Sequence, residues 1–246
     1  MKQQFAEQYG SLEQWHWWFR GRQRILEVVL LRELTGRPSR SIASLGCGPA
    51  EGLGWLMRLA GPNGRVVGLD ADPLHARRLG SGVEYVVGKL ETAPLASGSF
   101  DVVLALDVLE HLNDDAAGLR EAARLLKPGG LLLVTVPAFP SLWGGQDVIS
   151  HHRRRYTKRT LCQAFAQARL PHPRVTYFNM LLFPPVAAVR WVRSALGLAH
   201  RPRSDFDNHP GLMNEILAAM FAVERHVIHR VPMPVGVSLL ATTRLR

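Results

Sequence analysis

The stretch that decides the fold is Ser41-Ile42-Ala43-Ser44-Leu45-Gly46-Cys47-Gly48-Pro49-Ala50-Glu51-Gly52. A short apolar run ends in two closely spaced glycines, and a helix-compatible segment follows. This order predicts a strand, a tight turn and a helix start, where backbone N–H groups face a ligand. Glycine is needed at such a turn because a Cβ would block the ligand or forbid the turn dihedrals. The glycine pattern by itself is weak support for a nucleotide-like ligand.

A second buried strand is predicted at 65–70, and it ends in Asp70 about 20 residues after the glycines. A carboxylate at this position can accept hydrogen bonds from both hydroxyls of a ribose. Glu51 stands where the third glycine of a dinucleotide fingerprint belongs. A bulky charged residue there argues against a pyrophosphate packed on the helix. The sequence therefore favours a ligand with a ribose and no diphosphate, such as S-adenosylmethionine.

Five blocks of residues occur in a fixed order along the chain. They are 44–49 (SLGCGP), 68–70 (GLD), 98–103 (GSFDVV), 107–112 (DVLEHL) and 125–130 (LLKPGG). This series resembles the class I S-adenosylmethionine-dependent methyltransferases, the type 11 branch in particular, over residues 39–137. The resemblance implies an α/β, Rossmann-like fold with a seven-stranded, mostly parallel sheet and an antiparallel last strand. It also implies S-adenosyl-L-methionine as the cofactor.

The composition fits one α/β domain with insertions. The chain has 246 residues, 47% of them hydrophobic and 20% charged, and a formal net charge of +10. Such a charge indicates an anionic partner, although arginine-rich compositions also follow from genome base bias. Cys47 and Cys162 give neither a disulfide framework nor metal-ligand spacing, and no apolar signal segment begins the chain. We expect a reduced, cytoplasmic, bacterial protein.

The alternation of predicted strands and helices indicates a parallel sheet with helices on both faces. Ligands of such sheets lie beyond the carboxyl ends of the strands, where the five blocks end. Strands are expected at 41–45, 65–70, 83–87, 100–105, 130–136, 175–178 and 235–243, and helices at 3–34, 52–60, 73–79, 114–126, 157–169 and 212–230. The expected parts are a helical lid (1–38), a cofactor-binding core (39–137), a substrate loop with the sixth strand (138–179), a helical insertion (180–234) and a closing strand (235–246).

The resemblance places the cofactor at the ends of the first four strands. The residues implied are Gly46, Cys47, Gly48, Asp70, Ala71, Lys89, Leu90 and Leu106. Family members usually carry an acid where Lys89 stands, which accepts from the adenine amino group. Lysine cannot accept a hydrogen bond, so adenine recognition must use another group. We expect the backbone of Lys89 and Leu90 to supply it.

The aromatic stretch Trp15-His16-Trp17-Trp18-Phe19-Arg20 has two interpretations. One is packing against the sheet. The other is a lid over the cofactor and acceptor, because indole rings supply large rigid apolar area and a donor. The resemblance favours the lid, since a helical segment before the first strand commonly covers the pocket in this family. On that interpretation Trp17 and Trp18 contact the substrate.

Three residues are candidates for acid–base catalysis. His111 follows the fourth strand and is either a general base or a helix-start residue. A bacterial subgroup of the family shows a His-x-Arg-Arg-Tyr pattern that matches His152, Arg154, Arg155 and Tyr156. We expect His152 to deprotonate a hydroxyl, with Tyr156 beside it, unless the basic segment is only a solvated face.

The basic loop and the insertion provide the candidates for acceptor binding. Arg154 could clamp an anionic group, and Trp143 lies in the loop after the fifth strand. The apolar run 180–189 is too short to span a membrane before Arg190 and Arg193. It is a core helix, a cap on an apolar substrate, a dimer surface or an interfacial helix.

Together these features predict methyl transfer to a small-molecule or lipid-linked acceptor, at a hydroxyl oxygen, without a metal ion or nucleic acid. Peripheral contact with the inner membrane face remains an option. One alternative is an RNA methyltransferase, which the positive charge favours. Another is a protein that binds S-adenosylmethionine without transferring its methyl group, which the lysine at position 89 favours.

Overall fold

The computed structural model describes residues 12, 15–34, 40–77, 82–206 and 211–245. Its centre is a seven-stranded sheet in the order β3-β2-β1-β4-β5-β7-β6. The strands are β1 (Ser41–Leu45), β2 (Arg65–Asp70), β3 (Glu84–Val87), β4 (Phe100–Leu106), β5 (Leu126–Pro137), β6 (Arg174–Phe178) and β7 (Ser238–Arg244). Strands β1 to β5 pair in parallel, and β7 runs antiparallel to both β5 and β6. The predicted sheet is confirmed.

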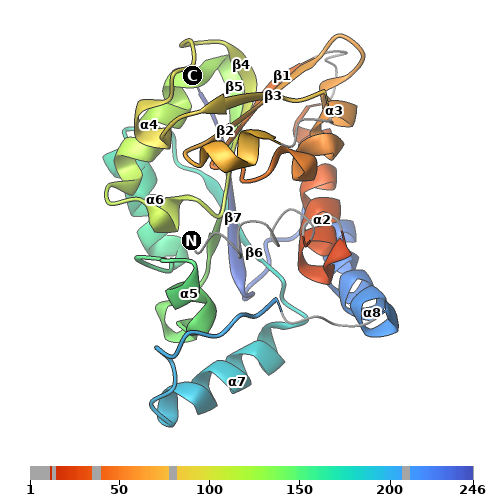
Figure 1. Ribbon diagram of the computed structural model, residues 1–246, viewed down its shortest axis with the longest axis vertical. Coiled ribbons are helices and arrows are strands. Elements are labelled where there is room, and N and C mark those ends of the chain that lie inside the picture. The colour runs from red at the N-terminus through yellow and green to blue at the C-terminus, as the bar shows by residue number, and fades with distance from the viewer. Residues whose placement is uncertain (1–11, 13–14, 35–39, 78–81, 207–210, 246) are drawn as a thin grey trace.

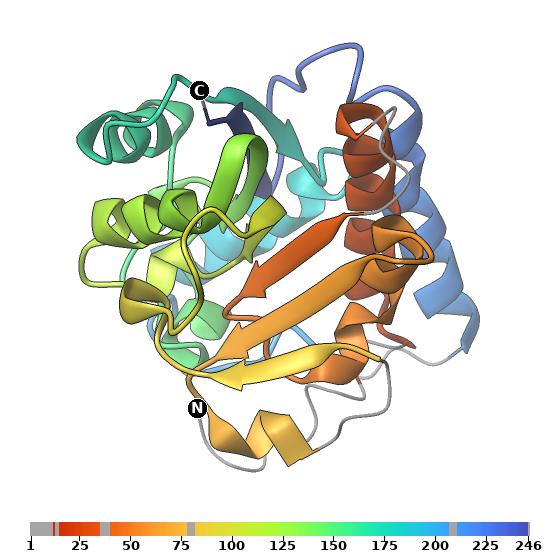
Figure 2. The ribbon, with the colours of Figure 1, turned by 90° about the horizontal axis from the view of Figure 1, so that it is seen from above.

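Helices cover both faces of this sheet. The helices are α2 (Trp17–Glu33), α3 (Gly54–Ala60), α4 (Asp115–Leu125), α5 (Gly145–Ile149), α6 (Lys158–Gln167), α7 (Phe183–Ala195) and α8 (Gly211–Ala222). Figure 1 shows α4 and α6 on one side of the sheet and α2 with α8 on the other. Figure 2, from above, shows the same division. Helix α7 lies at the lower end of the molecule in Figure 1.

The alternation of side chains along the strands builds a separate core on each face. In β1, Ala43 and Leu45 pack into the core that α4 and α6 cover, whereas Ile42 packs into the core under α2. Strand β5 follows the same rule, with Leu132 on the first side and Leu133 on the second. Because both faces are buried, the strands read as continuous apolar runs, which made them easy to recognise in the sequence.

The helix pair α2 and α8 packs closely because one of its contact positions lacks a side chain. A Cβ on Gly21 would lie 2.4 Å from the ring of Phe221. The start of α2 is fixed by His16, whose side chain accepts a hydrogen bond from the Trp18 N–H at 3.3 Å. The Asn214 side chain on α8 accepts from the Trp17 N–H at 2.7 Å. The helices of the predicted lid and the predicted insertion therefore support one another.

The predicted helices differ from the observed ones mainly at their ends. Of the helix expected at 3–34, residues 1–11 and 13–14 lie outside the described residues, and α2 begins after His16. The segment expected to be helical at 73–79 is a 3-10 turn, Pro73–Arg77, and its last two residues are outside the described part. The start of the 52–60 helix is also 3-10, at Ala50–Leu53.

Two other boundaries also shifted. Strand β5 begins at Leu126, not at 130, because Leu126 already pairs with Phe100 before an irregularity in the register. The last helix of the insertion ends at Ala222 and continues as a 3-10 turn, so the expected helix to 230 is too long. Among the described residues no helix is long and apolar enough to cross a membrane.

Candidate active site

A cavity of about 420 Å³ opens at the carboxyl ends of β1, β2 and β4. This volume lies within the range of ~300–1,000 Å³ that is usual for small-molecule sites. All eight residues predicted to bind the cofactor line it: Gly46, Cys47, Gly48, Asp70, Ala71, Lys89, Leu90 and Leu106. Of the residues predicted to be catalytic, His111 lines it as well. Parallel strands bring these separate segments to one edge, as expected for this fold class.

The turn after β1 needs glycine at both of its key positions. Gly46 and Gly48 have φ of +60° and +63°, in the left-handed region that side chains disfavour. A Cβ on Gly46 would lie 2.7 Å from the Val108 side chain, whereas one on Gly48 would meet no atom within 4 Å. Gly46 therefore permits close packing, and Gly48 leaves open space at the cavity wall.

Asp70 is held at the end of β2 by three hydrogen bonds. Its carboxylate accepts from the backbone N–H of Gly48 at 2.8 Å and of Asp72 at 2.9 Å, and it lies 3.3 Å from Nδ1 of His75. Burial alone would raise the pKa of Asp70, but the hydrogen bonds from His75 and the two backbone groups outweigh it. The net pKa is below its ordinary value, so the carboxylate is ionised at neutral pH.

The segment after β3, residues 88–91, lines the cavity. Lys89 is exposed, and a short 3-10 turn, Leu90–Thr92, starts directly after it. Leu90 is buried, and its side chain packs with the core on the α4 side of the sheet. This placement suits the expected use of backbone groups here, because the lysine side chain offers no acceptor.

Helix α2 forms one wall of the cavity, through residues that come just after the aromatic stretch. Phe19, Arg22, Gln23 and Leu26 line it, whereas Trp17 and Trp18 do not. The guanidinium of Arg22 lies 4.4 Å from the Trp18 ring centroid and forms an ion pair with Asp107 at the end of β4. Trp18 therefore contacts Arg22, a residue of the cavity wall, and does not line the cavity itself. Helix α2 borders the cavity, and a lid function for it stays a prediction.

Beside the cavity, His111 meets a second histidine from the loop after α5. The rings of His111 and His152 have centroids 4.8 Å apart and stand nearly perpendicular. Burial, with the neighbouring His152 and His151, lowers the pKa of His111 to about 4. His152 Nδ1 lies 2.8 Å from the carboxylate of Asp147, which fixes the orientation of its ring. His152 itself does not line the cavity; it stands behind His111.

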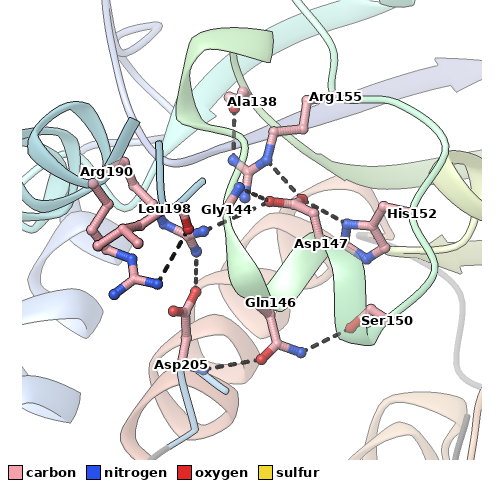
Figure 3. Close-up of polar contacts among 11 residues, drawn as sticks. Ala138, Gly144, Gln146, Asp147, Ser150, His152, Arg155, Arg190, Leu198 and Asp205 are labelled. Atoms are coloured by element: carbon pink, nitrogen blue, oxygen red, sulfur yellow. Dashed lines mark hydrogen bonds and ion pairs between the residues drawn. The ribbon is translucent and has the colours of Figure 1, made fainter. Parts of the chain in front are cut away.

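Asp147 is the centre of a buried polar network, drawn in Figure 3. It is fully buried and accepts from Arg155 Nε at 2.8 Å and from the Gly144 N–H at 2.8 Å. Burial would raise its pKa, but hydrogen bonds from His152 and Arg155 lower it to about 2. Arg190, from α7, reaches within 3.8 Å of Asp147 and pairs with Asp205. The insertion is thus tied to the loop that carries His152.

Three residues predicted for catalysis or substrate binding lie away from the cavity. Tyr156 is buried, and its hydroxyl donates to Asp115 at 2.8 Å. Arg154 donates to the backbone carbonyls of Leu112 and Asn113 at 3.0 and 2.9 Å. Trp143 is half-buried, with its ring 6.5 Å from that of His200. None of the three lines the cavity.

The sequence left Arg22 either on a solvated face or at the substrate mouth, and it did not reveal the contacts that the structure forms around the site. Asp147 holds His152, Arg22 and Asp107 close one side of the cavity, and Glu110 lies buried beside His152. Asp147 precedes His152 by five residues, and that spacing is the one feature that could have revealed it. The partners of Arg22 and Glu110 come from distant segments and leave no local pattern.

Residues 43–134 match the family described as methyltransferase domain. The match begins in β1, ends in β5, and includes the glycine turn, Asp70 and His111. These residues are a class I S-adenosylmethionine-dependent methyltransferase domain. The residues that line its cavity fit the cofactor of that family, S-adenosylmethionine, because an ionised acid and a turn with two glycines line the same space.

Two curated relatives and one solved structure are similar to this chain. A probable S-adenosylmethionine-dependent methyltransferase of Mycolicibacterium smegmatis is 34% identical over 56% of this chain and 52% of its own length. A malonyl-[acyl-carrier protein] O-methyltransferase of Enterobacter lignolyticus is 32% identical over 60% and 61%. A chain of the solved complex that contains the Haloferax volcanii Trm112 methyltransferase activator has a TM-score of 0.59 at 20% identity, covering 98% of this chain and 93% of that one.

The chain spans about half the length of the curated relatives that it matches, from 52% to 61% in the two cases given. The solved structure, at 20% identity, shows the fold alone. The methyltransferase domain and its cofactor are therefore shared with the relatives, whereas the acceptor and the activity of the whole protein need their own argument.

Proposed function

We propose that this protein transfers a methyl group from S-adenosylmethionine to a hydroxyl oxygen of a small-molecule or lipid-linked acceptor. The observation that carries the proposal is the shared cavity, lined by the glycine turn and Asp70 on one side and by His111 on another. A cofactor held at the turn and an acceptor held at the histidine would then lie next to each other. Alignment of that kind is the main requirement of methyl transfer.

The cofactor would be held by groups already positioned for it. In this proposal Asp70 accepts from the ribose hydroxyls and the backbone of Lys89 and Leu90 meets the adenine. Gly46, Cys47 and Gly48 contact the remainder, and Leu106 supplies apolar contact. S-adenosylmethionine brings an electrophilic methyl group, which the acceptor oxygen takes as the sulfur–carbon bond breaks and a neutral thioether leaves.

The acceptor would lie against His111, with His152 behind it. The acceptor hydroxyl loses its proton as the new carbon–oxygen bond forms, and the proton passes through the histidine pair to solvent. Asp147 holds His152 in one ring orientation, so it acts as a positioning residue. The oxygen preference is supported by the Enterobacter relative, which is named an O-methyltransferase.

The lipid-linked option rests on helix α7. Val189, Trp191, Val192 and Leu196 are each more than half exposed on it, and Arg193 lies among them. Exposed apolar side chains interspersed with arginine are typical of a helix that lies at a membrane surface. Co-sedimentation with vesicles tests this: binding to anionic but not to zwitterionic vesicles supports peripheral contact.

The proposed activity is tested by incubating the protein with labelled S-adenosylmethionine and a panel of phenolic, aliphatic and lipid-linked hydroxyl compounds. Formation of S-adenosylhomocysteine that depends on one class of acceptor supports the proposal. Cofactor binding without such turnover for any class would instead indicate a protein that binds the cofactor and does not transfer methyl. His152→Ala is expected to lower turnover and leave cofactor affinity unchanged.

The net charge of +10 keeps one alternative open, an RNA acceptor. Binding to RNA phosphates weakens steeply with salt. A filter-binding series from low to high salt therefore separates the two. Tight RNA binding that falls steeply with salt, together with RNA-dependent turnover, would replace the small-molecule proposal.

A further inference from the structure

A cluster of three potential metal ligands lies directly beside the cavity. Glu110, His111 and His152 each offer one ligand atom, and these atoms all lie within 4.8 Å of one another. His111 lines the cavity, and the neighbouring Glu110 is fully buried. The three residues come from two segments, the turn after β4 and the loop after α5.

The buried carboxylate of Glu110 is unsatisfied in the described part of the chain. The residue is 0% exposed, and neither carboxylate oxygen has a hydrogen-bond partner in the described part of the chain. The nearest cationic candidate, Nε2 of His152, lies 4.0 Å from Oε1, beyond hydrogen-bond distance. Arg155 is already engaged with Asp147 and with the carbonyl of Ala138. A buried carboxylate without such partners is costly, and metal coordination is one way to compensate it.

His152 is arranged as metal-binding histidines usually are. A metal-bound imidazole typically donates its other N–H to a carboxylate or a backbone carbonyl. The Nδ1 of His152 lies 2.8 Å from the carboxylate of Asp147, and its Nε2 lies 4.0 Å from Oε1 of Glu110. His111 supplies a second imidazole with a ring nitrogen within 4.8 Å of these groups.

We propose that Glu110, His111 and His152 bind a divalent cation of the first transition series at the wall of the cofactor cavity. Two imidazoles and one carboxylate suit Zn²⁺ or Fe²⁺, and a three-residue set leaves coordination positions open for other ligands. No metal was expected from the sequence, because the spacing of these residues along the chain matches no common metal motif.

The consequence for catalysis rests on the proposed function. A cation at this position would hold the acceptor oxygen next to the cofactor and lower the pKa of the acceptor hydroxyl. With both imidazoles bound to the cation, the proton leaves directly to solvent instead of through the histidine pair, and no strong general base is needed. An acceptor with two neighbouring oxygens would bind best, because it could occupy two open positions of the cation.

The binding test uses the full chain after chelator treatment, without cofactor or acceptor. Zn²⁺ is titrated in competition with a chromophoric chelator, and Co²⁺ binding is followed by its visible absorption. We expect one equivalent of each ion to bind. His152→Ala and His111→Ala should weaken Zn²⁺ binding at least about 100-fold, beyond the loss that substitutions in the outer shell cause.

A neighbouring histidine provides the matched control. His151 is exposed and lies outside the cluster, with φ of +56°. His151→Asn keeps a residue that tolerates this backbone conformation, and it should bind Zn²⁺ as the wild type does. Glu110→Gln, nearly isosteric, should also weaken binding, and thermal unfolding shows whether each variant is folded.

Absence of Zn²⁺ and Co²⁺ binding by the wild-type protein overturns the proposal, and that result needs no variant. Binding that survives both His152→Ala and His111→Ala overturns it as well. Methyl transfer is measured separately on the same samples. Turnover that is equal with and without bound cation overturns the catalytic role, whereas cofactor binding without any turnover counts against the proposed function and not against the metal site.

Discussion

The two sides of the cavity are built in different ways. The side that carries the predicted cofactor residues, called the cofactor side here, consists of short contiguous segments, each directly after a parallel strand, and its main acid, Asp70, is hydrogen-bonded only to groups close to it at this edge. The histidine side depends on Asp147, which is fully buried and bonded to groups from its own loop and from α7. On the first side the protein leaves contacts for a ligand to make. On the second side the protein's own groups satisfy Asp147, whereas Glu110 is left without a hydrogen-bond partner among the described residues.

This difference predicts whether a substitution changes ligand affinity or the stability of the fold. A change on the cofactor side should alter ligand affinity more than stability, because the lost contacts are made to the ligand. A change in the network around Asp147 should alter stability first, because it leaves buried charges without a partner. The following substitutions test this contrast, beginning with the largest expected effect.

The largest effect is expected for Asp147→Asn. Arg155 and Arg190 would remain buried beside a neutral amide, and breaking a buried pair in this way costs about 3–5 kcal/mol. Urea unfolding measures the loss. The control is Asp114→Asn, at an exposed pair with Arg120, where asparagine still caps α4 and the change should stay within about 0.5 kcal/mol. A loss below about 1 kcal/mol for Asp147→Asn would contradict the network's role.

Asp70→Ala should weaken cofactor affinity by about 1.5–3 kcal/mol, the scale of hydrogen bonds to a charged group. Calorimetric titration with S-adenosylmethionine measures it. Glu84→Gln serves as the control, because this acid lies exposed at the start of the neighbouring strand, paired with Arg65. Unchanged affinity in Asp70→Ala would remove the cofactor assignment of this edge of the sheet.

Gly48→Ala and Gly98→Ala separate backbone strain from ligand contact. Both glycines have φ of +63°, and a Cβ on either would meet no atom within 4 Å. Each substitution should therefore cost about 1–2 kcal/mol of stability. Only Gly48 lines the cavity, so only Gly48→Ala should also lower cofactor affinity. Equal affinities in the two variants would show that the ligand does not approach the turn.

The smallest effect is expected for Arg154→Lys. The guanidinium is partly exposed and bonds the carbonyls of Leu112 and Asn113, so stability should fall by about 1 kcal/mol. The KM for the acceptor should not change, because Arg154 does not line the cavity. A tenfold rise in KM at unchanged stability would instead support the role in acceptor binding that the sequence suggested.

The eight residues that the sequence assigned to the cofactor line one cavity, because the information that places them is local. Each segment is an apolar strand followed directly by a turn. Parallel strands bring such turns together at one edge of the sheet. Strand β2 and its terminal acid were located to the residue. His152 and His111 were found as candidates, but 41 residues separate them, and only the structure shows that their rings meet.

Arg190 shows why the remainder could not be predicted. In the sequence it reads as the charged end of an apolar run, pointing to solvent or lipid headgroups. In the structure it is buried and paired with Asp205 and Asp147. The pairing depends on how α7 packs against the loop, and no local pattern records a partner 43 residues away.

By itself the sequence determined the parallel strands, the glycine turn and the ribose-binding candidate, because these follow from strand periodicity and from turn dihedrals that few residues can adopt. Its resemblance to a known family implied the seven-stranded sheet and the class of cofactor. Only the tertiary structure decided which acids and histidines meet, that Glu110 lies buried without a hydrogen-bond partner, and that Tyr156 and Arg154 lie away from the cavity. Burial and long-range pairing depend on the packing of separate segments, and a linear pattern does not encode that packing in any one place.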